Sequence, residues 1–437
     1  MAARETALNA LIACRKNGAW PNAALKELLQ RDRLESRDAA LCTRLVYGVL
    51  QNRNRLDFYL KQFLTGKLSG LHPVVKDILH LGLYQIAELD RVPDSAAVNE
   101  AVELSKKYCP KQKNAPALVN AVLRKAASTR GSWTEPTGYA EKYSHPEELI
   151  ALLKKDLPKG KLEPMLIADN TAPRTCIQVN TLKITSDELT RLLTEKGMEV
   201  SRHSWMENCL VLSGVGNLER LEEFRKGYFY VQDAASRLSV RCAKLQKNWR
   251  ILDCCAAPGG KSFAAAMEME GTGSILSCDI HPHKAELIAK GAQRLGFGSI
   301  RAQCRDASVW NPDWTEAFDA VLADVPCSGL GIIRKKPDIR YKNLQEMEAL
   351  PDLQLSILEN QSNYVRKGGV LLYSTCTVLK RENEEVVTEF LERHPEFFPE
   401  ALELPEIFPK NGTGMLTFIP GEYDTDGFFI CRLRRKP

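Results

Sequence analysis

The sequence predicts an α/β fold in its C-terminal half, with an open and mainly parallel sheet, preceded by a small α+β unit and an all-α N-terminal region. Three observations carry this prediction. Helical periodicity fills the first part of the chain, strand-like and helical runs mix in the middle, and strands alternate with helices from Trp249 onward. A chain of 437 residues is long enough for two to three domains. We therefore expect domains over 1–135, 144–235 and 236–437.

Apolar residues recur at helical spacing through the N-terminal region, with no strand-like pattern. One repeat is formed by Leu45, Val46, Val49 and Leu50. Residues 1–130 contain 21 Lys and Arg against 12 Asp and Glu, a balance of +9, while the rest of the chain carries −4. An excess of this kind in one segment favours a polyanionic partner such as nucleic acid, and the alternative is a solvated helical surface.

The N-terminus resembles a lipoprotein cleavage site only superficially, at Leu11-Ile12-Ala13-Cys14. Leu8, Leu11 and Ile12 fit one face of a helix, so we expect a mature amphipathic helix there. No apolar run approaches the ~20 residues that a membrane span needs. The 13 cysteines show no paired spacing, which indicates a reducing compartment. We expect a cytoplasmic protein.

The middle of the chain alternates between strand and helix signals. Thr175 to Asn180 alternates as a strand, and Cys209–Leu212 and Gly227–Val231 are further candidates. The patterns from Ser144 to Glu147 and from Thr185 to Glu188 both fit a capping box at a helix start. These signals predict a small α+β unit.

Strands and helices alternate in the C-terminal region. The strand candidates are Ile251–Cys255, Ser274–Asp279, Ser299–Gln303, Phe318–Ala323 and Val370–Ser374. A last pair, Met415–Ile419 and Phe428–Leu433, could close the sheet as an antiparallel hairpin. This order predicts a mainly parallel sheet whose loops at the carboxyl strand ends carry the reactive groups.

A loop of small residues follows the first of these strands and precedes a helix. Its sequence is Cys255-Ala256-Ala257-Pro258-Gly259-Gly260-Lys261. Small residues let the backbone approach a ligand closely, and helix amides favour a negatively charged group. The run is neither GxGxxG nor GxxxxGK[ST], which disfavours a dinucleotide and leaves an NAD-dependent oxidoreductase as a weak alternative. A plain strand–helix turn is the other alternative.

Two aspartates strengthen the ligand interpretation. Asp279 ends the next strand, where a carboxylate can accept both hydroxyls of a ribose, and Asp306 follows the third strand, where it could reach an adenine amino group. Each aspartate alone is more often a solvated strand end. Three consecutive strands that each end in a suitable group predict an adenosine-containing cofactor, and S-adenosyl-L-methionine fits at least as well as a dinucleotide.

Two cysteines follow the later strands. Cys327 lies in Asp324-Val325-Pro326-Cys327-Ser328-Gly329 and Cys376 in Ser374-Thr375-Cys376. A lone cysteine after a strand is usually a small buried hydrophobe. A thiolate that adds to carbon 6 of a pyrimidine, however, makes carbon 5 nucleophilic toward an activated methyl group. Asp324 could bond nitrogen 3 and the exocyclic amine, favouring cytosine over uracil, or could simply cap a turn.

Taken together, the three motifs resemble the signature of the RNA 5-methylcytosine methyltransferases. The resemblance implies a Rossmann-like S-adenosylmethionine-dependent methyltransferase domain. It also implies that Cys376 is the nucleophile and that Cys327 assists product release. The residues that it assigns to the S-adenosylmethionine site are Cys255, Ala256, Ala257, Pro258, Gly259, Gly260, Lys261, Asp279, Asp306 and Asp324. The run from Gly227 to Ser236 resembles the family's segment just before the cofactor domain.

The N-terminal region extends the resemblance to the whole chain. Val46-Tyr47-Gly48-Val49-Leu50 resembles the antiterminator-like RNA-binding domain of one bacterial branch, the ribosomal small-subunit RNA methyltransferase B group, which methylates the cytosine called 967 in 16S rRNA. The implied function is methyl transfer from S-adenosyl-L-methionine to carbon 5 of a specific 16S rRNA cytosine through a covalent cysteine–carbon 6 adduct. The target base must leave its stack, so single-stranded or loop RNA is expected. A tRNA substrate and a non-catalytic RNA-binding assembly factor remain as alternatives.

Two further features lie outside these motifs. The run from Arg334 to Arg340 is basic and would hold substrate phosphates, or else is a solvated charge run. His281 and His283 follow Asp279 without a third ligand at a plausible spacing, so we expect no structural metal. The sequence leaves the oligomeric state open, with a monomer as the expectation.

Overall fold

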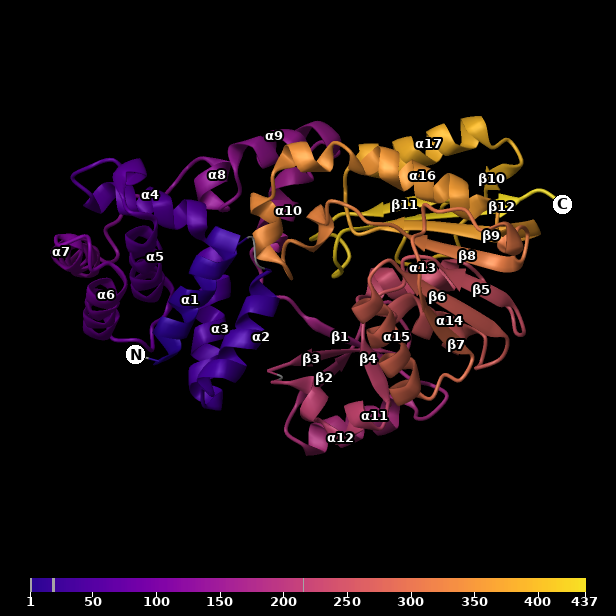
Figure 1. The fold of residues 1–437 in the computed structure, drawn as a ribbon, viewed down its shortest axis with the longest axis horizontal. Coiled ribbons are helices and arrows are strands. Elements are labelled where there is room, and N and C mark those ends of the chain that lie inside the picture. Colours follow the sequence, from indigo (N-terminus) through magenta and orange to yellow (C-terminus); the bar gives the residue numbers. More distant parts are fainter. Residues whose placement is uncertain (1, 18–19, 215) are drawn as a thin grey trace. The chain divides into compact units, whose positions relative to one another are not determined.

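The protein was analysed as a computed structural model that describes residues 2–17, 20–214 and 216–437. The chain forms two compact units (Figure 1). The first comprises Met1–Lys155 together with Lys336–Lys342, and the second comprises Asp156–Lys335 and Asn343–Pro437. The three predicted domain limits at 1–135, 144–235 and 236–437 stay predictions.

The first unit is built from helices, as the periodicity predicts. They are α1 Ala2–Asn17, α2 Pro21–Asp32, α3 Ser36–Gln51, α4 Arg53–Phe63, α5 Pro73–Glu88, α6 Asp94–Tyr108, α7 Ala115–Ser128, the short α8 Tyr139–Lys142 and most of α9 Glu147–Asp156. Helix α5 lies at the centre, because it is apolar on nearly every side and is buried along most of its length. Within the described residues of 1–130 we find no strand.

Glycines let two neighbours approach α5 closely. A Cβ added at Gly48 of α3 would lie 2.0 Å from Cζ of Tyr84, and one at Gly82 would lie 2.4 Å from Leu123 of α7. Since real side chains never come so close, these helices pack at distances that only glycine permits at these positions.

The segment Lys336–Lys342 belongs to the helical unit although the surrounding sequence does not. It contains a 3-10 turn, η5 Pro337–Tyr341. Arg340 is buried, and its Nη1 donates hydrogen bonds to the backbone oxygens of Gln51 (2.8 Å) and Ser144 (3.0 Å). Arg340 therefore anchors its own segment, and its predicted role in holding substrate phosphates is wrong.

The second unit begins with a small antiparallel sheet. Its strands are β1 Thr175–Val179, β2 Glu199–Arg202, β3 Cys209–Ser213 and β4 Phe229–Val231, in the order β2-β3-β1-β4. Helices α10 Leu162–Ala168, α11 Ser186–Glu195 and α12 Glu222–Arg225 accompany it. This confirms the predicted α+β unit.

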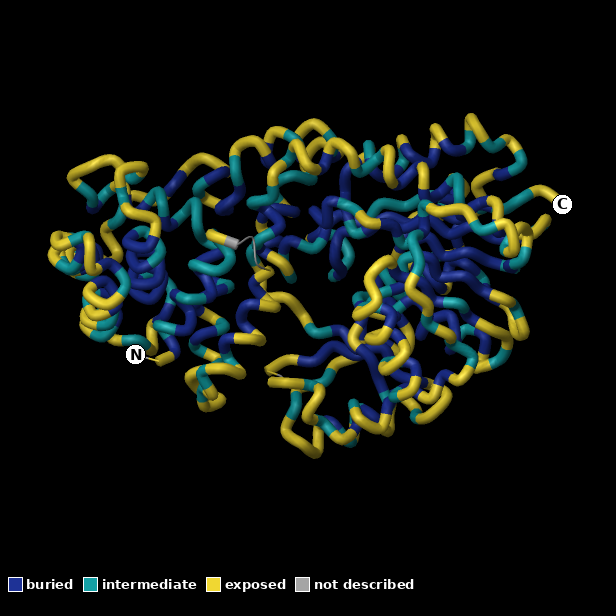
Figure 2. Tube along the Cα trace, viewed as in Figure 1, coloured by how far each residue is buried: buried dark blue, intermediate teal, exposed yellow. Residues whose placement is uncertain are grey.

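A larger mixed sheet forms the rest of this unit. Its strands are β5 Arg250–Asp253, β6 Ser274–Asp279, β7 Ile300–Cys304, β8 Phe318–Asp324, β9 Val365–Thr375, β10 Phe397–Pro399, β11 Met415–Phe418 and β12 Phe428–Arg435. The order is β10-β12-β9-β8-β5-β6-β7, with β11 pairing β12. Neighbours from β7 to β9 pair in parallel, and β12 runs antiparallel to β9. Figure 2 shows most of the central strands β5, β8 and β9 as buried (dark blue), whereas β7 is half-buried to exposed.

The strand order fixes where a ligand can enter. The chain order reverses between β5 and β8, which is the topological switch point of the sheet. Helices follow the strands, namely α13 Ala234–Cys242, α14 Gly260–Glu268, α15 Pro282–Leu295, α16 Leu350–Ser362 and α17 Glu384–Arg393 (Figure 1). All the predicted site residues follow the carboxyl ends of β5 to β9, at one edge of this sheet.

The two predicted capping boxes have different outcomes. Thr185 caps α11: its hydroxyl accepts from the amide of Glu188, whose carboxylate accepts from the Thr185 amide. The prediction for Ser144 is wrong, because α9 begins three residues later and Ser144 Oγ accepts from the amide of Asn54 instead. No helix in the described part of the chain is long and apolar enough to cross a membrane.

Candidate functional site

The two cysteines lie together at the ends of β8 and β9. Because Asp324 pairs with Ser374 in the parallel register, the turn after β8 and the turn after β9 leave the sheet side by side. The two Sγ atoms, of Cys327 and Cys376, are 3.2 Å apart, and the amide of Cys376 donates to Cys327 Sγ at 3.3 Å. Both residues are partly exposed. The structure thus brings together the two thiols that the sequence singles out.

The two sulfurs differ in their surroundings. The hydrogen bond to the Cys376 sulfur, together with burial, raises the pKa of Cys327 well above its usual value. Cys327 therefore stays a protonated thiol at neutral pH and can donate to the sulfur of Cys376. The amide of Cys376 acts in the opposite direction, because its hydrogen bond to Cys327 Sγ lowers the pKa of Cys327.

Asp324 ends β8 beside the thiols and is held at both oxygens. Oδ1 accepts from Ser374 Oγ at 2.8 Å, and Oδ2 forms an ion pair with Lys261 Nζ at 2.6 Å. Lys261 is buried, and its ammonium also donates to Ser236 Oγ at 3.0 Å. The Asp324 side chain is still 31% exposed, which leaves it accessible to a substrate. No sequence pattern predicts the pairing of Lys261 with Asp324.

The loop between β5 and α14 makes close contacts that exclude larger residues. Gly259 has φ of 110°, and a Cβ there would lie 2.4 Å from the ring of Phe263. A Cβ on Gly260 would lie 3.0 Å from the amide nitrogen of Gln232. These glycines are therefore needed for packing against Phe263 and Gln232, and the predicted close approach of the backbone to a ligand stays a prediction.

The buried carboxylate of Asp253 contacts the start of α14, directly after the loop between β5 and α14. Asp253, at the end of β5, accepts from Ser262 Oγ at 2.7 Å, and that hydroxyl lies 2.6 Å from Ser277 Oγ. Burial raises the pKa of Asp253 to about 7. Its Oδ1 is buried and accepts no hydrogen bond from a described residue. Asp253 is not among the predicted site residues, because the sequence around it is typical of a buried strand.

The other two aspartates take different positions. Asp279 is largely buried at the end of β6, where Oδ1 accepts from the amide of His281 at 3.1 Å. Asp306 turns toward its own loop, and its Oδ1 accepts from the amide and the hydroxyl of Ser308 at 2.9 and 2.7 Å. These two bonds lower the pKa of Asp306.

The basic run after Cys327 has partners within the protein. Arg334 Nη2 lies 3.1 Å from Asp426 Oδ1, and Lys335 Nζ lies 2.5 Å from Asp426 Oδ2 and 3.1 Å from Asp233 Oδ2. Burial and the negative charge of Asp233 raise the pKa of Asp426 to about 6. The positive charges of Lys335 and Arg334 act in the opposite direction. Arg334 and Lys335 thus neutralise buried carboxylates, and their contact with substrate phosphates stays a prediction.

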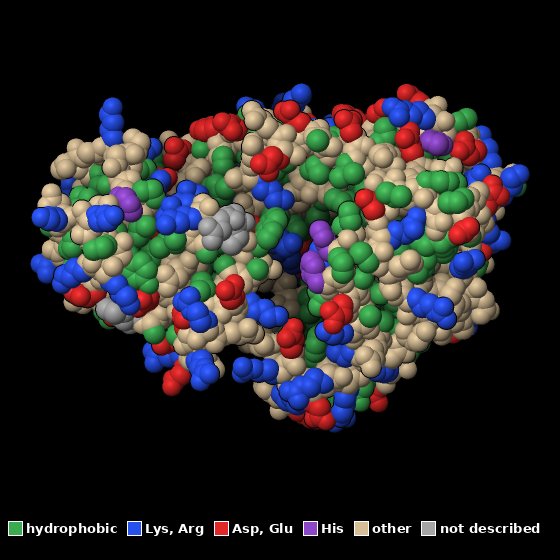
Figure 3. All heavy atoms as spheres, viewed as in Figure 1, with side chains coloured by type: hydrophobic (Ala, Val, Ile, Leu, Met, Phe, Trp, Pro, Cys, Tyr) green, Lys and Arg blue, Asp and Glu red, His purple; other side chains and the backbone are tan. Residues whose placement is uncertain are grey.

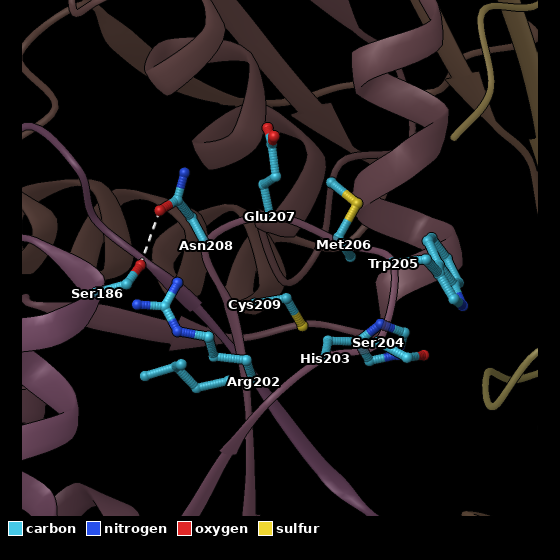
Figure 4. A pocket seen from close by; sticks show the side chains of 10 residues that line it. Ser186, Arg202, His203, Ser204, Trp205, Met206, Glu207, Asn208 and Cys209 are labelled. Carbon is cyan, nitrogen blue, oxygen red and sulfur yellow. Dashed lines mark hydrogen bonds between the residues drawn. The ribbon is translucent and has the colours of Figure 1, made fainter. Parts of the chain in front are cut away.

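A pocket of about 240 Å³ lies elsewhere in this unit, around the β2–β3 turn (Figure 4). Ser186 and residues 202–210 line it, and Ser186 Oγ donates to Asn208 Oδ1 at 2.7 Å. None of the predicted site residues lines this pocket. In the part of the chain that the structure describes, no three His, Cys, Asp or Glu side chains gather as a metal site would require. The absence of a structural metal stays a prediction.

Family models match three successive parts of the chain. Residues 1–128 match the NusB family, residues 145–219 match the ferredoxin-like domain of the RsmF/B-like methyltransferases, and residues 240–434 match the 16S rRNA methyltransferase RsmB/F family. The third match contains the whole set of predicted site residues.

Relatives are similar over the full length. A protein of Bacillus subtilis (strain 168) named "Probable ribosomal RNA small subunit methyltransferase B" is 37% identical over 99% of this chain and 98% of its own. The "Ribosomal RNA small subunit methyltransferase B" of Vibrio cholerae is 33% identical over 93% of this chain and 92% of its own. The crystal structure of PH0851 is 25% identical, with a TM-score of 0.82 and 99% of both chains covered. The chain therefore belongs to the 16S rRNA methyltransferase RsmB/F family, as a small-subunit rRNA methyltransferase with an N-terminal NusB domain.

Proposed function

We propose that this methyltransferase modifies carbon 5 of a specific cytosine in 16S rRNA through a covalent adduct between Cys376 and carbon 6 of the base. The observation that carries the proposal is the 3.2 Å separation of the Cys327 and Cys376 sulfurs at two adjacent strand ends. A pair of thiols at this spacing lets one act as nucleophile while the other supplies or accepts a proton beside it.

The proposed donor is S-adenosyl-L-methionine, and the residues present fit it. Asp279 offers a carboxylate at the end of β6 for ribose hydroxyls, and the loop between β5 and α14 lies at the switch point of the sheet, where such ligands bind. The loop from Cys255 to Lys261 would hold the donor. Asp306 is kept as a candidate for the adenine amino group. When bound, this cofactor supplies an electrophilic methyl group on a positively charged sulfur.

The chemistry assigned to the protein has two covalent events. The Cys376 thiolate adds to carbon 6, which makes carbon 5 nucleophilic, and carbon 5 then bonds the methyl group as the bond between that methyl group and the donor sulfur breaks. The carbon 5 proton passes to a solvent base, its electron pair restores the carbon 5–carbon 6 double bond, and the carbon 6–sulfur bond breaks so that Cys376 leaves as a thiolate. Cys327, whose sulfur lies 3.2 Å away, is placed to donate a hydrogen bond to the departing thiolate, so it assists product release.

Asp324 is proposed to select cytosine. Its carboxylate is oriented by Ser374 and Lys261 and remains partly exposed, so it can accept from the exocyclic amine of cytosine. Uracil has a carbonyl at that position, which would face a carboxylate oxygen without a hydrogen between them. A site built to bond one donor rejects a base that lacks it.

RNA is the proposed partner of the helical unit as well. Its Lys and Arg side chains are distributed over the face seen in Figure 3. We propose single-stranded or loop RNA as the form of the target, because the base must leave its stack to reach the thiols. The proposed location is the cytoplasm, since all 13 cysteines are unbridged and the two catalytic thiols must stay reduced. A monomer stays a prediction.

Methyl transfer to purified RNAs separates this proposal from its two alternatives. The protein is incubated with S-adenosyl-L-methionine and either 16S rRNA or total tRNA, and bisulfite sequencing then locates 5-methylcytosine. We expect modification of one cytosine in 16S rRNA and none in tRNA. If only tRNA is methylated, tRNA is the substrate. If neither RNA is methylated, the result supports a non-catalytic assembly factor.

A further inference from the structure

A buried carboxylate clamps the turn that carries Cys327. Glu382 ends the 3-10 turn η7 Lys380–Glu382, ahead of α17, and is fully buried. Its Oε2 accepts from the amide of Ser328 at 2.8 Å and from Gln354 Nε2 at 2.9 Å. The same Gln354 nitrogen donates to the backbone oxygen of Pro326 at 2.9 Å. The residues on both sides of Cys327 are therefore fixed to one carboxylate.

The next residue clamps the turn that carries Cys376. Asn383 Oδ1 accepts from Thr375 Oγ1 at 2.6 Å, and its Nδ2 donates to the backbone oxygen of Thr377 at 3.2 Å. The residues on both sides of Cys376 are thus held by one amide. Ser328 Oγ and Thr377 Oγ1 also lie 2.8 Å apart, which ties the two turns to each other.

We propose that Glu382 and Asn383 are positioning residues, which set the separation of the two thiol-bearing turns from a single rigid point behind the sheet edge. Glu382 and Asn383 are adjacent in the chain and cannot move far apart. The distance between the two turns that they hold is therefore restricted. Helix α16 contains Gln354, and helix α17 begins directly after Asn383. These two helices lie side by side (Figure 1). The inference deepens the proposed covalent mechanism and rests on it.

Electrostatics support a second effect of Glu382. The pKa of Cys327 is raised mainly by its hydrogen bond with Cys376, by burial and by the charge on Cys376. The negative charge of Glu382 is a smaller cause in the same direction. The titratable groups that face Cys327 are Cys376, Glu382 and Tyr373. Tyr373 stays neutral, since burial raises its pKa, and its hydroxyl donates to the backbone oxygen of Glu382 at 2.6 Å. Glu382 is therefore a further cause, beside the Cys376 sulfur and burial, that raises the pKa of Cys327.

The charge effect can be measured without RNA or a methyl donor. Alkylation of Cys327 by iodoacetamide is followed against pH by peptide mass spectrometry in the full chain. Glu382→Gln keeps an acceptor oxygen for the Ser328 amide but removes the charge, so we expect the apparent pKa of Cys327 to fall. Glu223→Gln is the matched control: Glu223 is also a buried carboxylate, and it pairs with Lys196 away from the thiols. A Cys327 profile that is unchanged in Glu382→Gln would overturn the charge effect.

Steady-state kinetics test the positioning role. Glu382→Ala and Asn383→Ala each remove both anchors of one turn, and we expect kcat to fall about 10- to 100-fold with KM for RNA within about twofold. Glu382→Gln should recover most of the lost kcat because its amide oxygen still accepts from Ser328. Thermal unfolding checks that each variant is folded. If Glu382→Ala is unfolded, the two single variants Glu382→Gln and Asn383→Ala provide the test. Wild-type kcat in the folded alanine variants would overturn the inference.

The same assay separates this inference from the proposed function. Cys376→Ala is measured in parallel, in an otherwise unchanged chain. If Cys376→Ala is inactive while the clamp variants are fully active, only the positioning role fails. If Cys376→Ala retains methyl transfer, the covalent mechanism fails, and the alkylation profile of Cys327 still decides the effect of Glu382 on that thiol.

Discussion

At the scale of single residues, the site depends on which polar atoms remain accessible to a substrate after each side chain has bonded its neighbours in the protein. Asp324 uses one oxygen for Ser374 and the other for Lys261, yet remains partly exposed. Asp306 turns its carboxylate into its own loop, and Asp279 keeps its carboxylate at the end of β6. The three aspartates looked alike in the sequence, and their hydrogen-bond partners distinguish them.

Asp279 is the residue on which ribose recognition depends most in this account. Replacing it with alanine removes the acceptor for the ribose hydroxyls, so the Kd for S-adenosyl-L-methionine should rise about 10- to 100-fold. Isothermal titration calorimetry measures this directly. Asp306→Ala is the comparison and should have a smaller effect, because its carboxylate is already bonded to Ser308. A Kd that is unchanged in Asp279→Ala would remove this residue from the site.

Asp253 makes stability depend on pH in an unusual direction. Its pKa of about 7 in the folded protein lies above the ordinary value, so the folded state holds a proton that the unfolded chain releases. Its ionisation therefore lowers stability progressively as pH rises from about 4 to 7. Asp253→Asn keeps an acceptor for Ser262 and removes this cost.

Urea unfolding of Asp253→Asn and wild type at two pH values checks the effect. The advantage of the variant should grow by about 2 kcal/mol between about pH 5.5 and pH 8.5. An advantage that does not change with pH would mean that Asp253 is ionised throughout this range.

Pairings between distant residues were the part of the site that the sequence could not predict. Lys261 and Asp324 are far apart in the chain, and each was assigned to the cofactor site on its own motif. The sequence shows charges but not their burial, so Arg334 and Lys335 looked like a phosphate site while they neutralise Asp233 and Asp426. Glu382 and Asn383 carried no motif that the analysis recognised.

At the scale of elements, strands with strong apolar patterns were predicted well. Ser274–Asp279 is observed with the predicted ends, and the last two strands pair antiparallel as expected. Strand β10 was missed, because three residues ending at Pro399 are too short to show alternation. The capping pattern at Ser144 failed where the same pattern at Thr185 succeeded, since a hydroxyl can bond a distant amide that the local sequence does not show.

The contact between α3 and α5 gives a test of packing. Gly48→Ala places a Cβ against the ring of Tyr84, and the required displacement should lower the free energy of unfolding by about 1–3 kcal/mol. Gly66→Ala is the matched control, because a Cβ there meets no atom within 4 Å. Urea unfolding monitored by circular dichroism compares the two. Equal stability of both variants would contradict the close approach of these helices.

At the scale of the whole molecule, the topology of the large sheet explains why two cysteines 49 positions apart meet. Parallel strands end at the same edge, and β8 and β9 are neighbours. The sequence predicts that both cysteines follow strands of a mainly parallel sheet, and the observed strand order brings them together. The sequence did not predict that Lys336–Lys342 would belong to the helical unit, because that assignment depends on the burial of Arg340.

The charge of the helical unit predicts how RNA binding responds to salt. Lys106 and Lys107 pair with Glu103 and Glu5, while Lys111 and Lys113 form no ion pair among the described residues. If this unit holds RNA phosphates, Lys111→Gln with Lys113→Gln should weaken binding and reduce the salt slope by about 1 to 2. The matched control, Lys106→Gln with Lys107→Gln, should change it less. Fluorescence anisotropy with a 16S rRNA fragment measures both, and equal slopes for the two double variants would contradict the assignment.

Trapping of the reaction intermediate tests the central claim most directly. The Cys327→Ala variant is incubated with the target RNA and S-adenosyl-L-methionine and run on a denaturing gel. The account predicts that a protein–RNA adduct accumulates, because methylated base can no longer be released efficiently, and that replacing Cys376 by alanine abolishes this adduct. An adduct that persists without the Cys376 sulfur, or full methyl transfer by both variants, would contradict the account.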